Sequence, residues 1–420
     1  MLLSIALAMT ALTTSFDVGG VHVILRKNDA NNVVAANLYL LGGARQVSEA
    51  NAGIEPILLD VSERGTQRYP KATLRRAMAR LGSEIVVAPS ADWTMFGIRS
   101  STEVFDSTFA IFADRLIHPI LAKSDVNLVK TQYLSGIRQR RDDPDALASY
   151  LADSITFTGH PYSVSVVGNE KSIQSIDSAA LREYQRTQLV TSRMLLVVVG
   201  NVDQAHIEQL VAQTIGQLPR GNYKWTAPPR IPELQTALVV ERRQLPTNYI
   251  LGYYSGPLAS GSDYQALRVA TSVLTGRMFA EIRTRENLTY DVHAPFVDRA
   301  ATAGGLYVST VSPDTTLKLM HAAVADLQQG MLDPVGLKQL EEQFITEYFL
   351  DNETNAAQAD FLARSQLYEG DYRAADRFVN ELKNVTPEAV QRVARKYMKN
   401  FRFAYVGDPS KLNPATISLF

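Results

Sequence analysis

The stretches Val21-His-Val-Ile-Leu-Arg26 and Val33-Val-Ala-Ala-Asn-Leu-Tyr-Leu40 decide the fold class of this chain. Both runs are rich in β-branched and apolar residues, and the polar residues 28–32 between them are typical of a turn. The pattern predicts two strands paired as a hairpin. A second strand pair is predicted at Glu84 to Ala88 and Trp93 to Ile98, and a helix is predicted over 53–64.

The opening pattern returns in the second half of the chain, as Ala237 to Arg242 and Tyr249 to Tyr254 around a polar turn. A proline-rich linker is predicted at 219–236. We therefore expect an α+β protein of two homologous domains, residues 16–218 and 237–420. Each is expected to be a mostly antiparallel sheet with helices packed on one face.

Composition and charge limit the kinds of ligand and catalytic site that this chain can have. The chain has 420 residues, of which 46% are hydrophobic and 20% charged, as in soluble globular proteins. A formal net charge of -1 gives no sign of nucleic-acid or acidic-membrane binding, so a neutral or peptide ligand is expected. The absence of Cys excludes disulfides, Cys–zinc sites and thiol nucleophiles.

Residues 1–15 combine an apolar run, Leu2 to Leu12, with the small residues Thr13-Thr14-Ser15. This is typical of the end of a secretory signal, and the run is too short to span a bilayer. We expect a periplasmic or extracellular protein without a transmembrane segment. An ordinary apolar terminus in a cytoplasmic protein is the alternative.

Several motifs in this order resemble the pitrilysin and insulinase family of zinc peptidases, the inverzincins. They include Gly53-Ile54, Arg138 to Pro144, Gly159 to Tyr162 and Ile282 to Tyr290. The most similar branch is the mitochondrial processing peptidase type with its short bacterial relatives. The resemblance runs from about Phe16 to Asp408, and it implies a two-domain subunit that forms half of a clamshell chamber.

The zinc ligands of that family are missing at their own positions. An H-x-x-E-H helix needs two His one turn apart and a Glu as general base. On alignment these fall on Pro56, Leu59 and Asp60, and Ser135 and Gly136 replace a downstream carboxylate pair. The resemblance therefore implies no zinc in this chain. A discontinuous zinc site is the alternative, although no two of the six His are four residues apart.

The family's Arg and Tyr of the second repeat are retained as Arg283 and Tyr290. By resemblance they hold the substrate backbone and polarise the scissile carbonyl, because both are fixed hydrogen-bond donors. Asn287 stands where the family has Gly and is compatible with a left-handed backbone. A surface ion pair for Arg283 and a packed ring for Tyr290 are the alternative.

The segment from Ile85 to Phe96 matches the edge at which relatives add a substrate as an extra strand. Ala88, Ser90 and Trp93 are the candidate substrate contacts. Pro89 removes one backbone donor, and an ordinary sheet edge with a core Trp93 is the alternative. A glycine-rich loop is missing at 276–279, so presequence recognition is not expected.

The resemblance implies a pseudo-peptidase subunit that is inactive alone. It would complete the site of a homologous partner that carries H-x-x-E-H and zinc, as a heterodimer acting on peptides. A structural scaffold subunit and a stand-alone peptide-binding homodimer are the alternatives.

Overall fold

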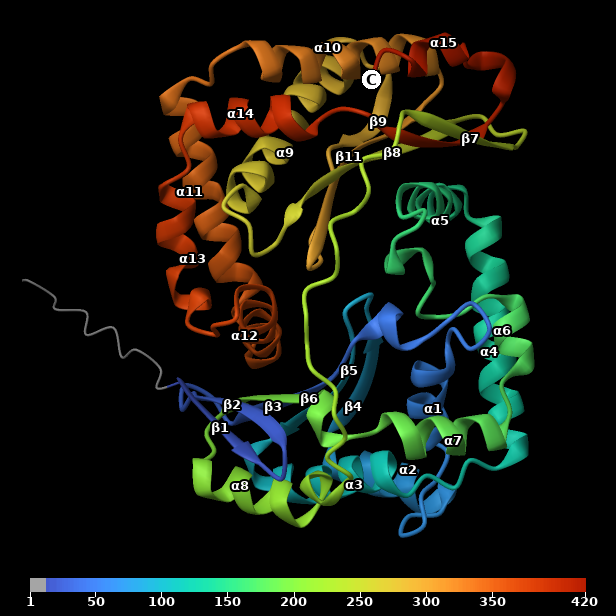
Figure 1. Cartoon of the computed structure of the whole chain (residues 1–420), viewed down its shortest axis with the longest axis vertical. Helices are drawn as coiled ribbons and strands as arrows, with labels where there is room; N and C mark the ends of the chain where they lie inside the picture. Colours follow the sequence, from blue (N-terminus) through green and yellow to red (C-terminus); the bar gives the residue numbers. More distant parts are fainter. Residues whose placement is uncertain (1–12) are drawn as a thin grey trace, which may run out of the picture. The chain divides into compact units, whose positions relative to one another are not determined.

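The computed structural model describes residues 13–420, and the chain divides into two compact units (Figure 1). Among the described residues, the first unit contains 13–130, Val166–Trp225 and Asp351–Ser365, and the second contains the remainder. Residues 1–12, which carry most of the predicted export signal, lie outside the described residues. Thr13 to Ser15 of that segment belong to a strand.

The first unit is built on a six-stranded sheet. Its strands lie in the order β1 (Thr13–Val18), β2 (Val21–Lys27), β6 (Met194–Gly200), β3 (Val33–Leu41), β5 (Trp93–Ser101) and β4 (Glu84–Pro89). The predicted hairpin of β2 with β3 is wrong, because β6 lies between them, parallel to β2 and antiparallel to β3. The predicted pairing of β4 with β5 is confirmed.

One face of this sheet carries helices that bury aromatic side chains. Phe112 stacks on Phe96 of β5 with ring centroids 4.6 Å apart, and both rings are fully buried. Burial of one large apolar side chain stabilises the fold by roughly 1.5–3 kcal/mol. The helices of the unit are α1 (Ile54–Ser62), α2 (Lys71–Leu81), α3 (Phe105–Ile117), α6 (Glu170–Ser175), α7 (Ser178–Gln188) and α8 (Gln204–Gln213).

The second unit repeats this topology. Its sheet has the order β10 (Phe296–Val297), β11 (Ala301–Thr310), β8 (Asn248–Leu258), β12 (Arg402–Gly407) and β7 (Ala237–Arg242), and β9 (Thr289–His293) also pairs with β11. As β6 does in the first sheet, β12 lies between the two opening strands, parallel to β7 and antiparallel to β8. The two sheets therefore share one insertion pattern, which supports the predicted duplication.

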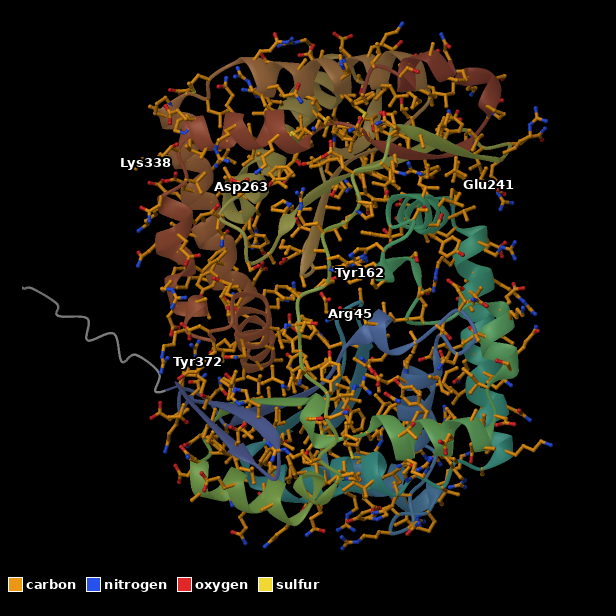
Figure 2. All side chains as sticks on the ribbon, in the orientation of Figure 1. Arg45, Tyr162, Glu241, Asp263, Lys338 and Tyr372 are labelled. Carbon is orange, nitrogen blue, oxygen red and sulfur yellow. The ribbon has the colours of Figure 1, made fainter. Side chains whose placement is uncertain are left out.

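The helices of the second unit are joined by an ionic contact at the start of α9 (Tyr264–Met278). Asp263, labelled in Figure 2, accepts hydrogen bonds from Arg392, Lys396 and Tyr397 at 2.6–2.8 Å. Those three residues belong to α14 (Pro387–Tyr397), which packs on α9. The other helices are α10 (Pro313–Gln329), α11 (Pro334–Asp351), α13 (Ala374–Lys383) and α15 (Pro414–Ile417).

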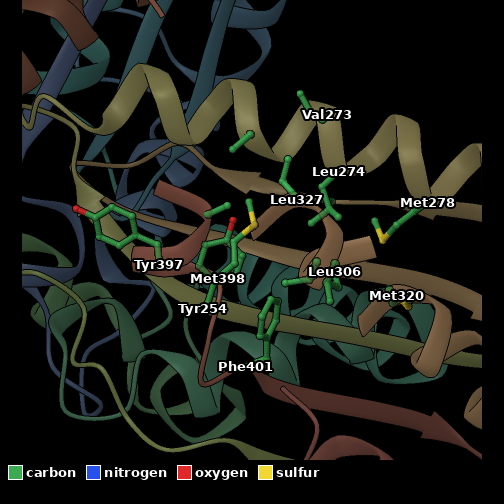
Figure 3. Close-up of a cluster of buried hydrophobic side chains, with 14 of the residues drawn as sticks. Tyr254, Val273, Leu274, Met278, Leu306, Met320, Leu327, Tyr397, Met398 and Phe401 are labelled. Carbon is green, nitrogen blue, oxygen red and sulfur yellow. The ribbon is translucent and has the colours of Figure 1, made fainter. Parts of the chain in front are cut away.

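The core of this unit lies between the sheet and these helices (Figure 3). Leu274 of α9, Leu306 of β11 and Met320 of α10 are all fully buried in it. Alternate strand residues enter the core, as Leu306 and Val308 of β11 do, because successive side chains of a strand point to opposite faces.

Two helices pack on the sheet of the other sequence repeat. Helix α5 (Pro144–Thr156) precedes the linker, yet it packs on β8 and β12. Helix α12 (Asn355–Glu369) follows the linker, yet Asn355 donates to the carbonyl of Val33 at 2.6 Å and Tyr39 donates to Asp360 at 3.4 Å in the first unit. The compact units are therefore not the contiguous ranges 16–218 and 237–420. Residues 219–236 have no regular secondary structure, as expected of a linker.

Candidate functional site

Helix α1 contains the positions that correspond to the zinc motif. Gly53 caps it with φ +89°, and a Cβ there would lie 2.6 Å from Cδ1 of Ile173, so the position requires Gly. Pro56 lies in the first turn, where its missing N–H is not needed. Pro56 and Leu59 are buried and Asp60 is half-buried. These three side chains present one carboxylate and no imidazole.

The buried side of α1 is instead fixed by arginines. Glu55, 3% exposed, accepts from Arg193 Nη2 and from the Tyr184 hydroxyl, both at 2.9 Å. Arg115 donates to the Leu59 carbonyl at 3.2 Å and to Ser62 Oγ at 3.1 Å, and burial lowers the pKa of Arg115 to about 10. Sequence reasoning missed these contacts. The only indication of them in the sequence was Glu55, which is next to the zinc-motif positions.

Zinc does not fit the residues at these positions. Pro56 and Leu59 have no donor atom, and a zinc site needs three or four N, O or S ligands. Ser135 and Gly136 lie on exposed positions of α4 (Lys123–Asp142), where neither supplies a carboxylate. Over residues 13–420, no three His, Cys, Asp or Glu side chains form a group that could hold a metal ion.

The candidate substrate edge is β4, the last strand of the first sheet. Ala88 is exposed and pairs with Met95 of β5, whereas the Ser90 N–H is already bonded to the Trp93 carbonyl at 2.7 Å. Trp93 is only 3% exposed and packs edge-on against Tyr39 with centroids 5.6 Å apart. Ala88 is therefore exposed at this edge, while the Trp93 ring belongs to the core.

Arg283 and Tyr290 are brought together in the second unit. Helix α9 continues into a π-helix, η6 (Phe279–Arg285), which ends in a turn before β9. Asn287 in that turn has φ +51°, which confirms the expected left-handed backbone. The Glu286 N–H bonds to Glu281 O and the Leu288 N–H bonds to Ile282 O, both at 3.0 Å. π-helical turns are uncommon and recur at functional sites.

The Arg283 guanidinium lies over two aromatic rings. Its Cζ is 4.9 Å from the Tyr290 centroid and 4.8 Å from that of Phe279. Tyr290 is 82% exposed and Phe279 is 42% exposed, so both rings lie at the surface, and Arg283 is half-buried. Sequence reasoning missed Phe279 as a partner, although its position four residues before Arg283 on a helix was a signal.

Arg283 differs from the neighbouring arginines because it has no carboxylate partner among the described residues. Arg277 pairs with Asp326, and Arg285 pairs with Glu281 at 2.5 Å. Across residues 13–420 the Arg283 side chain makes no hydrogen bond and no ion pair, and its contacts are with the two rings. Its N–H donors are therefore available to a ligand.

The Gly159 to Tyr162 motif has a structural role. His160 is 2% exposed, its Nδ1 accepts the Tyr162 N–H at 3.2 Å, and its Nε2 lies 2.9 Å from the Pro229 carbonyl. The Tyr162 hydroxyl accepts the Ala301 N–H at 3.3 Å. These contacts attach the segment to the linker and to β11.

Comparisons with known proteins agree with a peptidase-like fold. Residues 22–170 match the family described as Insulinase (Peptidase family M16), and residues 175–343 match the Peptidase M16 inactive domain. An uncharacterised zinc protease of Bacillus subtilis is 21% identical over 90% of this chain and 93% of its own length. The mitochondrial-processing peptidase subunit beta of Blastocladiella emersonii is 20% identical over 92% and 86%.

A solved structure shares the fold. It is the crystal structure of a peptidase M16 inactive domain from Pseudomonas fluorescens, with a TM-score of 0.85 and 18% identity. The alignment covers 94% of this chain and 98% of that one. Over residues 13–420, no helix is both long and apolar enough to cross a membrane. The two family matches together account for most of the sequence, and the chain therefore belongs to peptidase family M16, as a member that lacks the H-x-x-E-H motif.

Proposed function

We propose that this chain is the zinc-free subunit of a two-chain M16 endopeptidase and is inactive alone. Its partner is a homologous chain that carries H-x-x-E-H and binds the zinc. This chain contributes Arg283, Tyr290 and part of the wall of the peptide-binding chamber. The substrate is a peptide or an unfolded polypeptide.

The unpaired Arg283 guanidinium carries the proposal. Two arginines on the same helical segment, Arg277 and Arg285, are neutralised by Asp326 and Glu281, whereas Arg283 is not. A half-buried arginine that lies over two rings and has no carboxylate partner within residues 13–420 keeps its N–H donors available, which suits recognition of an external oxygen. A carboxylate partner would have indicated a purely structural cation.

The chemistry of the pair follows from its donors. A guanidinium presents several N–H groups in a fixed fork, and the Tyr290 phenol adds one O–H. Donors placed in advance stabilise negative charge that develops on a scissile carbonyl, and they also hold backbone carbonyls of a bound peptide. Zinc, supplied by the partner when bound there, would activate water.

The loss of ligands in α1 supports the non-catalytic assignment. Leu59 is buried where a general base would be needed, and Pro56 is buried where a ligand would be needed. Membership of family M16 and likeness to a relative that is named as a subunit of a peptidase support the two-chain arrangement.

Cleavage of fluorescein-labelled casein tests the proposal. The partner is obtained by copurification, and activity is measured for each chain alone and for the mixture. We expect activity from the mixture only, and Arg283→Ala is expected to lower its kcat on the order of 100-fold, as for loss of an oxyanion donor. Arg285→Ala, two residues away and ion-paired with Glu281, is the matched control and is expected to change kcat little.

Two results would contradict the proposal. Equal cleavage by the partner alone and by the mixture would remove any contribution of this chain. Full activity of the Arg283→Ala mixture would assign the chain to a scaffold role, which needs assembly but no donor.

We also propose that the protein is exported to the periplasm or the cell exterior. The apolar run Leu2 to Leu12 supports this proposal. Cell fractionation and N-terminal sequencing of the mature protein test it, and an intact N-terminus in the cytoplasmic fraction would refute it.

A further inference from the structure

We infer that Phe279 is a positioning residue for Arg283. The ring holds the guanidinium at the surface by its π-face, so that the N–H donors stay free for the peptide oxygen. The inference rests on the proposed function of Arg283 and Tyr290, and it adds a residue that does not itself contact the substrate.

The backbone sets Phe279 and Arg283 side by side. Met278 and Ile282, four residues apart, are both fully buried and anchor this helical segment to the core. Phe279 and Arg283 each follow one position later, and their side chains meet away from the core, with Phe279 exposed and Arg283 half-buried. The guanidinium Cζ lies 4.8 Å from the Phe279 ring centroid, within the range of a cation–π contact.

A core role does not explain Phe279. The side chain is 42% exposed, whereas Met278 before it is fully buried. Burial therefore stabilises this ring less than it would stabilise a core phenylalanine, and the ring contact that it makes is with the Arg283 guanidinium. Tyr290 alone is a weaker anchor, because at 82% exposure its ring has few packing contacts to hold it in place.

The type of contact that holds Arg283 determines whether its N–H donors remain free. A carboxylate partner would occupy the guanidinium N–H groups, as Glu281 does for Arg285. An aromatic face attracts the cation through the ring quadrupole and leaves the N–H edges unoccupied. Phe279 therefore restricts the motion of Arg283 without competing with a ligand.

Two measurements on four variants test the inference. The variants are Phe279→Leu, which removes the ring, Phe279→Tyr, which restores it, Arg283→Ala, and Phe349→Leu as a control. Phe349 is 61% exposed on α11, so its replacement removes a comparable surface ring away from Arg283. Thermal unfolding of each variant checks that the fold is retained.

The first measurement needs no partner. The rate of phenylglyoxal modification of Arg283 is compared with that of exposed Arg75 in the same molecule, by mass mapping of peptides. We expect Phe279→Leu to raise the relative rate about two- to five-fold, the factor that corresponds to one exposed cation–π contact. Phe279→Tyr and Phe349→Leu should leave it near the wild-type rate. An unchanged rate in Phe279→Leu overturns the inference.

The second measurement is casein cleavage by the mixture with the zinc-bearing partner. We expect Phe279→Leu to lower kcat/KM by a similar factor and Phe279→Tyr to restore it. If Phe279→Leu cleaves like the wild type while Arg283→Ala loses activity, the positioning role is refuted and the proposed function stands. If cleavage is unchanged in Arg283→Ala as well, the proposed function fails, and with it the catalytic consequence of the stack.

Discussion

The Arg193 guanidinium lies 2.9 Å from the Glu55 carboxylate, and both side chains are almost completely buried. The pair joins α1 to the residue that immediately precedes β6, and Tyr184 of α7 completes it by donating to the same carboxylate oxygen at 2.9 Å. A helix whose zinc-motif positions hold one carboxylate and no imidazole is thus held by a buried ionic contact. Its role in this chain is structural.

Arg193→Met should destabilise the first unit strongly. It leaves the Glu55 carboxylate buried without its cation, which costs roughly 3–5 kcal/mol in the free energy of unfolding. Urea unfolding followed by circular dichroism measures the change. Arg186→Ala is the control, because the Arg186–Glu183 pair is 72% and 61% exposed and is screened by water, so its loss should change stability little.

The double variant Glu55→Gln with Arg193→Met refines this prediction. It removes both charges, so we expect it to be more stable than Arg193→Met alone. A double variant that is as unstable as the sum of two large single losses would show that packing, and not the unpaired charge, dominates.

Substitution of two glycines should have opposite effects. Gly53→Ala places a methyl group 2.6 Å from Ile173 at φ +89°, and we expect a loss of about 1–3 kcal/mol. Gly136 lies in helix α4, and a Cβ added there would meet no atom within 4 Å. Gly136→Ala should therefore raise stability by up to about 1 kcal/mol. Thermal unfolding of both variants checks the signs.

Tyr254→Phe should be neutral or slightly stabilising. Its hydroxyl is buried and finds no hydrogen-bond partner within the described chain, so removing it relieves a desolvation cost. Tyr405→Phe is the control, because that hydroxyl bonds to Asn248 at 2.8 Å and to the Asp408 carbonyl at 2.7 Å. We expect Tyr405→Phe to cost about 1–2 kcal/mol in urea unfolding, and equal effects of the two would contradict this.

Acid should weaken the second unit through Asp263. Burial by itself would raise the pKa of Asp263, but hydrogen bonds from Lys396, Arg392 and Tyr397 outweigh it and lower the pKa to about 2. The unfolded value is about 3.9. The stabilisation is therefore complete above about pH 4 and is lost as the pH falls towards 2.

The Asp263→Asn variant checks this assignment. Its melting temperature should be lower than that of the wild type at pH 6, and the difference should shrink as the pH is lowered to about 2.5, near the folded-state pKa. A difference that stays constant with pH would mean that the contact does not depend on the charge of Asp263.

Local patterns in the sequence predicted much of the fold and part of the site. The β4–β5 pairing follows from a short turn, and the linker follows from proline content. The left-handed turn at Asn287 follows from the resemblance, because the family has Gly at this position. The replacement of the family's zinc-motif residues by Pro56, Leu59 and Asp60 can be seen in the sequence, because the ability to bind zinc depends on residue type.

The tertiary structure decided what depends on residues far apart in the chain. β6 separates β2 from β3, and β12 separates β7 from β8, so in each sheet a buried strand from late in the repeat lies between the two opening strands. Glu55 and Arg193 are 138 residues apart. Local periodicity shows which face of a strand or helix is apolar, but only packing of the whole chain selects which elements bury those faces together.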